Sequence, residues 1–106
     1  DTVDRIAATI TMDDIIRIVT THFHLKLSDL QSKRRSQSVA QPRQIAMFLA
    51  RSLTRHSLEE IGGYFGGRDH TTVMHACNRI RELSEKDPAL ASVVEHMIAQ
   101  LRSNRS

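Results

Sequence analysis

Five polar side chains, Arg68-Asp69-His70-Thr71-Thr72, stand between a glycine pair and a segment with apolar residues at helical spacing. An aspartate can accept a hydrogen bond from the exocyclic amine of cytosine, and a threonine methyl can pack against the thymine methyl. A histidine can donate to a purine acceptor or to a phosphate. Asp69 alone also fits a purely structural role, because a carboxylate before a helix caps its free N–H groups. The run as a whole favours contact with nucleic acid.

The flanking segments predict a helix-turn-helix that would position this run. Ser57 and Glu60 have the spacing of a capping box, which would open a first helix over residues 57–66. Gly66-Gly67 would end it, since glycine readily adopts the left-handed conformation of a helix stop. A second helix would follow over roughly residues 70–85. Its predicted buried positions are Val73, Ala76, Cys77, Ile80 and Leu83. In DNA-binding versions of this motif, the second helix enters the major groove with its N-terminal residues against base edges.

Helical signals also dominate the rest of the chain. Thr11 and Asp14 resemble a capping box before an apolar stripe that ends at Phe23. A short turn follows at "LSDLQS", for which Ser28 is the predicted cap. An Asp-Pro pair at residues 87–88 would begin the last helix.

The segment Val39–Leu53 is apolar almost all round, which predicts a central, largely buried helix. Pro42 would lie in its first turn, where a missing N–H costs nothing. Together these patterns predict an all-α fold, a compact bundle of about six helices around the helix-turn-helix.

Positive charge is concentrated in one third of the chain. The net charge is +3 overall, yet residues 26–55 alone carry a net charge of +6. The bases of this segment are Lys26, Lys33, Arg34, Arg35, Arg43, Arg51 and Arg55. Part of it, "KRRSQS" at residues 33–38, lacks apolar residues, and we interpret it as an exposed basic loop. Such a clustered charge is typical of a protein that binds a polyanion.

The bulk composition excludes several other classes. A chain of 106 residues fits one domain. With three Phe, one Tyr and no Trp, it has too few rings for a stacking platform on single-stranded bases. No apolar run approaches the roughly 18–20 residues of a membrane span. A single cysteine excludes an internal disulfide and suits a reducing cytoplasm. The acidic start, without Met, predicts that residues 1–10 are the tail of an earlier helix and not a signal peptide.

Two chemical alternatives are weaker. His22 and His24, joined by His75 or Cys77, could suggest a metal site, but helical i, i+2 spacing points the first two in different directions and no ligand motif is present. Asp69-His70-Thr71 contains the residue types of a nucleophilic site, yet neighbours on one helical turn do not converge in a pocket. We therefore expect no metal and no catalytic residues.

At this point the chain resembles a known family. The segment "GGRDHTTVMHA", preceded by "SKRRSQSVAQPRQIAMFLARSLTRHSLEEIGGYFGG", is similar to the C-terminal DNA-binding domain of DnaA, the bacterial replication initiator. The resemblance runs from about Thr11 to Leu101. It implies an all-helical domain, related to the Trp repressor, that binds double-stranded DnaA boxes of the TTATCCACA type at the chromosomal origin and so initiates DNA replication.

The resemblance also implies the wider setting of residues 11–106 as the DNA-binding domain. Residues 1–10 would be the remnant of a linker helix to a preceding ATPase domain that is absent here. That domain, not this one, would hold ATP, and other domains would mediate oligomerisation at the origin. The linker region would contact acidic phospholipids. The protein would act in the bacterial cytoplasm, associated with the nucleoid.

Site residues follow from matching positions. By resemblance, Asp69, His70, Thr71 and Thr72 read bases in the major groove, and Arg35 enters the adjacent minor groove. Arg43 and Gln44 match phosphate-contacting positions. To the phosphate contacts we add charge and polar groups of the loop and of two helices: Lys33, Arg34, Arg51, His75 and Arg79.

The chain departs from the family pattern at four positions. Members often carry a basic residue where this chain has Gln37, Gln41 and Asn78, and many have Pro where it has Glu59. Each lost phosphate contact would flatten the salt dependence by roughly one unit of log–log slope. A carboxylate at Glu59 would repel phosphate unless it points away.

A protein-interaction module is the second hypothesis. The amphipathic final helix could dock a partner, and the acidic N-terminal helix could meet another domain. This hypothesis predicts that charge reversal at Arg35 leaves partner binding unchanged, whereas the DNA hypothesis predicts a severe loss of affinity.

Overall fold

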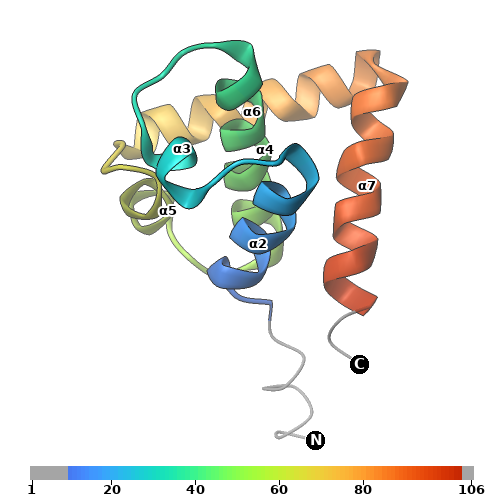
Figure 1. Ribbon diagram of the computed structural model, residues 1–106, viewed down its shortest axis with the longest axis horizontal. Coiled ribbons are helices and arrows are strands. Elements are labelled where there is room, and N and C mark those ends of the chain that lie inside the picture. The colour runs from blue at the N-terminus through green and yellow to red at the C-terminus, as the bar shows by residue number, and fades with distance from the viewer. Residues whose placement is uncertain (1–9, 104–106) are drawn as a thin grey trace, which may run out of the picture.

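The computed structural model describes residues 10–103, and this part of the chain contains six helices and no strand (Figure 1). The helices are α2 (Met12–Phe23), α3 (Leu27–Gln31), α4 (Gln37–Leu53), α5 (Leu58–Tyr64), α6 (His70–Lys86) and α7 (Pro88–Ser103). The all-α prediction is confirmed. Of the expected linker helix at residues 1–10, all but Ile10 lies outside the described residues.

Local caps set most helix starts, as the sequence predicted. The backbone N–H of Asp14 donates to Thr11 Oγ1 at 3.1 Å, and that of Thr11 donates back to Asp14 Oδ2 at 3.0 Å. Ser57 and Glu60 form the same reciprocal pair at the start of α5. Before α7, Asp87 Oδ1 accepts from the backbone N–H of Ala89 at 3.0 Å. These bonds satisfy N–H groups that a helix start leaves without partners.

Two predicted boundaries are wrong. Helix α4 begins at Gln37, not at Val39, because the carbonyl of Ser36 already accepts from the N–H of Ala40 at 2.8 Å. Pro42 is therefore the sixth residue of α4 and lies inside the helix, where it removes a backbone hydrogen bond. The N-terminus of α3 is held by Asp29, whose Oδ2 accepts from the N–H of Lys26 at 2.9 Å, and Ser28 lies within the helix.

Helix α4 is the centre of the core. It packs against α2, α3, α5 and α6, while α7 leans on α2 and on α6 (Figure 1). The largest fully buried side chains come from all six helices and from the turn after α5: Phe65, Ile15, Leu30, Ile45, Met47, Leu49, Ile61, Ile80 and Met97. Burial of such side chains contributes about 1.5–3 kcal/mol each. The core thereby fixes α5 and α6 relative to α4.

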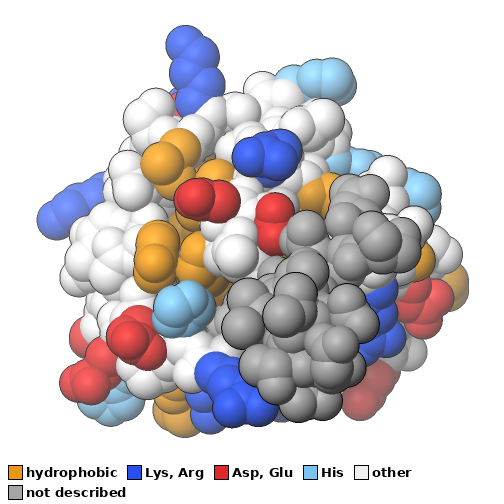
Figure 2. Space-filling model, turned by 90° about the horizontal axis from the view of Figure 1, so that it is seen from below, with side chains coloured by type: hydrophobic (Ala, Val, Ile, Leu, Met, Phe, Trp, Pro, Cys, Tyr) orange, Lys and Arg blue, Asp and Glu red, His pale blue; other side chains and the backbone are white. Residues whose placement is uncertain are grey.

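The face seen in Figure 2 lies on the side of the two chain ends. Acidic, basic and histidine side chains are interspersed on its described part, with apolar groups between them. This mixture differs from the single-sign surface expected of a polyanion site. Within residues 10–103, none of the helices is long and apolar enough to cross a membrane.

Candidate nucleic-acid interface

Two glycines, and hydrogen bonds to one carbonyl group, shape the turn between α5 and α6. Gly66 and Gly67 have φ of 85° and 75°, the left-handed conformation predicted for them. The carbonyl of Gly62 accepts from the N–H groups of Phe65, Gly67 and Arg68 at 3.0–3.1 Å. Phe65 is fully buried and anchors the turn in the core. The predicted helix-turn-helix is thus present, with α6 as its second helix.

The first turn of α6 presents the predicted base-reading residues. Asp69, His70 and Thr72 are exposed, and Thr71 is half-buried. Asp69 is also the N-cap, since its Oδ1 accepts from the backbone N–H of Thr72 at 2.8 Å. This hydrogen bond favours the ionised carboxylate and lowers the pKa of Asp69 below its usual value. Its Oδ2 can still accept from a base amine.

The basic loop joins α3 to α4 at residues 33–36. Lys33, Arg34 and Arg35 are all exposed. Arg34 approaches Asp29 at 3.9 Å with a side chain that is 62 % exposed, so this ion pair contributes little. Among the described residues, neither Lys33 nor Arg35 forms an ion pair. Both charges remain available to a polyanion.

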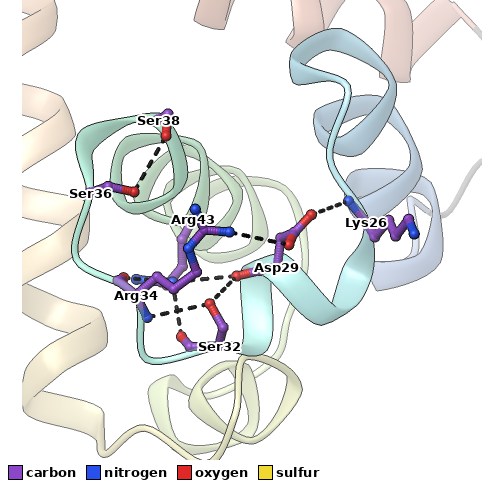
Figure 3. Close-up of polar contacts among 7 residues, drawn as sticks. All are labelled: Lys26, Asp29, Ser32, Arg34, Ser36, Ser38 and Arg43. Atoms are coloured by element: carbon purple, nitrogen blue, oxygen red, sulfur yellow. Dashed lines mark hydrogen bonds and ion pairs between the residues drawn. The ribbon is translucent and has the colours of Figure 1, made fainter.

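Arg43, an expected phosphate contact, is largely buried. Its side chain is 7 % exposed, and its guanidinium points at the backbone where α3 ends (Figure 3). Arg43 Nε donates to the carbonyl of Leu30 at 2.9 Å, and Nη2 donates to those of Ser32 at 2.9 Å and Arg34 at 3.1 Å. Burial, and then the charge of Arg68, lowers the pKa of Arg43. The carbonyl oxygens thus occupy Nε and Nη2 of the guanidinium.

Other predicted phosphate contacts gather in a groove of about 320 Å³ between α4 and α6. Gln44 lines it from α4, while Thr72, His75 and Arg79 line it from α6. His75 and Arg79 are exposed and Gln44 is half-buried. Arg43 also lines the groove, which therefore brings four predicted backbone-contacting residues next to a predicted base-reading residue.

Arg51 lies apart from this groove, in a shallow depression shared with His70, Ser57 and Leu58. Glu59, the acidic departure from the family pattern, lines the same depression. The carboxylate is exposed. It therefore lies on the same part of the surface as two predicted DNA-contacting residues.

The sequence predicts no role for Arg68, although this residue opens the polar run. In the structure it is half-buried, and its Nη1 donates to the carbonyl of Phe65 while Nη2 donates to that of Ser32. The second bond joins the turn before α6 to the start of the basic loop. The sequence shows an arginine between the glycine pair and the helix cap. It does not reveal the partner, Ser32, because that residue lies 36 positions away.

This arrangement, a helix-turn-helix with a polar first turn beside a basic loop, agrees with a comparison to known families. A family model described as the bacterial dnaA protein helix-turn-helix matches residues 12–80. The chain belongs to this family. Membership in the dnaA helix-turn-helix family establishes a DNA-binding domain of a replication initiator and not a catalytic domain.

The match to the dnaA helix-turn-helix family extends from α2 into α6. It includes the basic loop, both helices of the motif and the turn between them. Helix α7 follows the matched region and packs on α2 and α6. The matched region therefore contains all the residues that are predicted to contact DNA.

Other reactive groups lie outside the interface. Cys77 is buried at 4 % exposure, its Sγ donates to the carbonyl of Met47 at 3.6 Å, and burial raises the pKa of its thiol. Over residues 10–103, no three His, Cys, Asp or Glu side chains lie together where they could hold a metal ion. Because its side chain is buried, Cys77 belongs to the core.

Proposed function

We propose that this domain binds double-stranded DNA at DnaA boxes of the TTATCCACA type in the chromosomal origin. Helix α6 lies in the major groove and Arg35 enters the adjacent minor groove. The observation that carries the proposal is the hydrogen bond from Arg68 to the carbonyl of Ser32, which holds the start of the basic loop against the residue before the α6 cap. The two reading elements thus lie on neighbouring parts of one surface. The site of action is the bacterial nucleoid, in the cytoplasm.

The two grooves supply different information. In the major groove each base pair has its own pattern of donors, acceptors and methyl groups, which suits the exposed Asp69, His70 and Thr72. In the minor groove an arginine responds mainly to A·T content and groove width. A box with an A·T-rich end and a C·G-containing end matches this division between α6 and Arg35.

Phosphate contacts give the sequence-independent part of the affinity. We assign them to the exposed bases of the loop, Lys33 and Arg34, to the α4–α6 groove with Gln44, His75 and Arg79, and to Arg51. Arg43 stays in this set because it lines the same groove, although its Nε and Nη2 bind carbonyls of the protein. The minor-groove role of Arg35 remains because its side chain is exposed.

Fluorescence anisotropy on two labelled duplexes tests the proposal. One duplex carries a TTATCCACA box and the other a scrambled sequence, and each is titrated at two salt concentrations. We expect a large preference for the box that persists at the higher salt, since base contacts depend on salt less than phosphate contacts do. Equal and salt-sensitive binding of both duplexes would contradict sequence-specific reading and leave only a basic surface.

The absence of binding to either duplex would favour the interaction-module hypothesis. A groove of about 370 Å³ between α2 and α7, lined by Ile18, Thr21, His96 and Leu101 among others, would then be the surface to test first. Charge reversal at Arg35 separates the two functions, because the basic loop lies outside the α2–α7 groove. The substitution should weaken DNA binding and leave binding of a partner at this groove unchanged.

A further inference from the structure

The carbonyl of Ser32 is bound by two arginines from different elements. Arg43 Nη2, on α4, donates to it at 2.9 Å, and Arg68 Nη2, in the turn before α6, donates to the same oxygen. Ser32 is the residue at which α3 has ended and the basic loop begins. One backbone oxygen therefore ties the loop to the central helix and to the helix-turn-helix. We call Arg43, Ser32 and Arg68 the arginine clamp.

Arg43 also binds the backbone on both sides of Ser32. Its Nε donates to the carbonyl of Leu30 in the last turn of α3. Its Nη2 reaches the carbonyl of Arg34 at 3.1 Å, as Figure 3 shows. A helix of five residues has no stability of its own. The guanidinium replaces water at carbonyls that a helix end leaves without partners. It thereby fixes the backbone immediately before Arg35.

The turn before α6 meets the same backbone at two further points. Gln31 Nε2 donates to the carbonyl of Tyr64 at 3.0 Å. Gly66 approaches so closely that a Cβ on it would lie 2.3 Å from the carbonyl oxygen of Gln31. The end of α3 is thus docked on the turn that leads into Asp69. The distance from the basic loop to the first turn of α6 is set by direct contacts and not by a flexible connection.

The clamp places two cations side by side without a carboxylate on either of them. Among residues 10–103, neither Arg43 nor Arg68 forms an ion pair, and all their hydrogen-bond acceptors are backbone carbonyls. Burial lowers the pKa of both groups, so each charge is partly removed from water. Apolar side chains would fill this space at lower electrostatic cost. What arginines add is a planar fork that binds several acceptors in fixed directions.

We propose that Arg43 and Arg68 are positioning residues that set where Arg35 enters the minor groove relative to α6 in the major groove. The inference rests on the proposed function. The clamp acts through the Ser32 carbonyl, and this role is separate from the phosphate contact assigned to Arg43 at the α4–α6 groove. The spacing between the two parts of the box that the protein reads is therefore determined by the clamp.

Arg43→Lys tests the clamp while keeping the charge. Lysine has a single ammonium in place of the fork, so it cannot hold the carbonyls of Leu30, Ser32 and Arg34 in the same directions. Three duplexes are titrated: the box, a box changed at its A·T-rich end, and a box changed at its C·G-containing end. We expect Arg43→Lys, like Arg35→Ala, to lose most of the discrimination at the A·T-rich end and to keep that at the other end. Arg68→Lys should behave in the same way.

A double-mutant cycle then identifies the route of the effect. In an Arg35→Ala background, Arg43→Lys should change the ratio of affinities for the box and for the box altered at its A·T-rich end less than about twofold, because the residue that it positions is gone. Independent losses of this ratio, whose fold-changes multiply, would overturn the proposal and show that Arg43 reads that end itself. Equal loss at both ends of the box, with a lowered melting temperature by circular dichroism, would also overturn it, since that is general destabilisation.

Two controls keep the outcomes separate. Arg17→Lys, an exposed substitution of the same kind on α2, should alter neither discrimination nor melting temperature. If Arg43→Lys does not fold, Arg68→Lys decides, because Arg68 is half-buried and a folded variant is expected. A wild-type domain that shows no preference for the box would refute the proposed function. If the wild-type domain prefers the box but the effects of Arg35→Ala and Arg43→Lys on discrimination multiply independently, only the clamp is refuted.

Discussion

At the residue scale, Asp69 has two proposed roles, which substitutions to Asn and to Ala can separate. Its Oδ1 caps α6 through the N–H of Thr72, and its Oδ2 is assigned to a base. Asn keeps the cap but presents an amide, whereas Ala loses both, and removal of an N-cap costs about 0.5–2 kcal/mol of stability.

We therefore expect Asp69→Asn to retain the free energy of unfolding and to change the base preferred at one position of the box. Asp69→Ala should lower both stability and affinity. Urea unfolding together with titration of box variants measures the two effects. An Asp69→Asn domain with unchanged base preference would show that the carboxylate serves only as a cap.

Thr71 is half-buried in the first turn of α6, between the exposed His70 and Thr72. Thr71→Met places a longer side chain at the surface that is proposed to meet the base edges. We expect the preference for the box over the scrambled duplex to disappear while the circular dichroism spectrum and melting temperature stay the same. A preserved preference would exclude Thr71 from base reading.

Glu59 is an acidic residue in the depression that also contains Arg51 and His70. A carboxylate near the phosphates would oppose binding, with a contribution well under about 1 kcal/mol at an exposed site. Glu59→Gln should therefore tighten binding of the box and of the scrambled duplex alike, by about two- to threefold. Glu95→Gln on α7 is the matched control. No change in affinity would mean that the Glu59 carboxylate points away from the backbone of the DNA.

At the element scale, the carboxylate caps of α5 and α6 predict a pH dependence of stability. The backbone N–H of Ser57 lowers the pKa of Glu60, and that of Thr72 lowers the pKa of Asp69. A carboxyl with a lower pKa in the folded state stabilises the fold above its unfolded pKa, and this contribution is lost as the pH falls through the folded pKa.

The melting temperature should therefore decline as the pH is lowered through and below about 4, the ordinary range of these carboxyls. Glu60→Gln with Asp69→Asn should reduce that decline, since both amides resist titration. Both groups are fully exposed, so a modest difference is expected. Identical pH profiles for the wild-type and double-substituted domains would show that these caps do not contribute.

The elements also show what the sequence could predict. Thr11, Ser57 and Asp69 cap partners three residues away, so a local pattern reveals them. Arg43 is different, because its carbonyl partners lie 9–14 residues earlier in the chain and belong to backbone that any residue could supply. Nothing in the residue types around position 43 distinguishes an arginine that binds phosphate from one that binds carbonyls.

The same reasoning applies to the start of α4. Ser36 begins it through its backbone carbonyl, while its Oγ lies 3.4 Å from that of Ser38 instead of capping an N–H. Pro42 indicated an early position in the helix, and this was wrong because the helix begins two residues sooner. Helix types and the core followed from apolar spacing, but this boundary is set by a backbone carbonyl, that of Ser36, which residue types do not reveal.

At the scale of the whole molecule, burial redistributes the charge that the sequence places in residues 26–55. Arg43 is withdrawn into the structure, and Lys33, Arg34 and Arg35 remain exposed around it. The face near the chain ends carries both signs of charge (Figure 2). Affinity for the DNA backbone should therefore depend on the exposed cations beside the proposed interface, and one more there should increase it.

Gln37→Arg supplies that additional cation at an exposed position where α4 begins, next to the basic loop. One more phosphate contact should steepen the slope of log affinity against log salt by about 0.9 and tighten both the box and the scrambled duplex at low salt. Anisotropy titrations over about 50–200 mM salt give the slope. Arg102→Gln, on α7, is the control for net charge, because it removes an exposed cation from outside the proposed interface. A gain restricted to the box would instead mean that position 37 contacts bases, and the DNA would have to lie closer to the start of α4 than we propose.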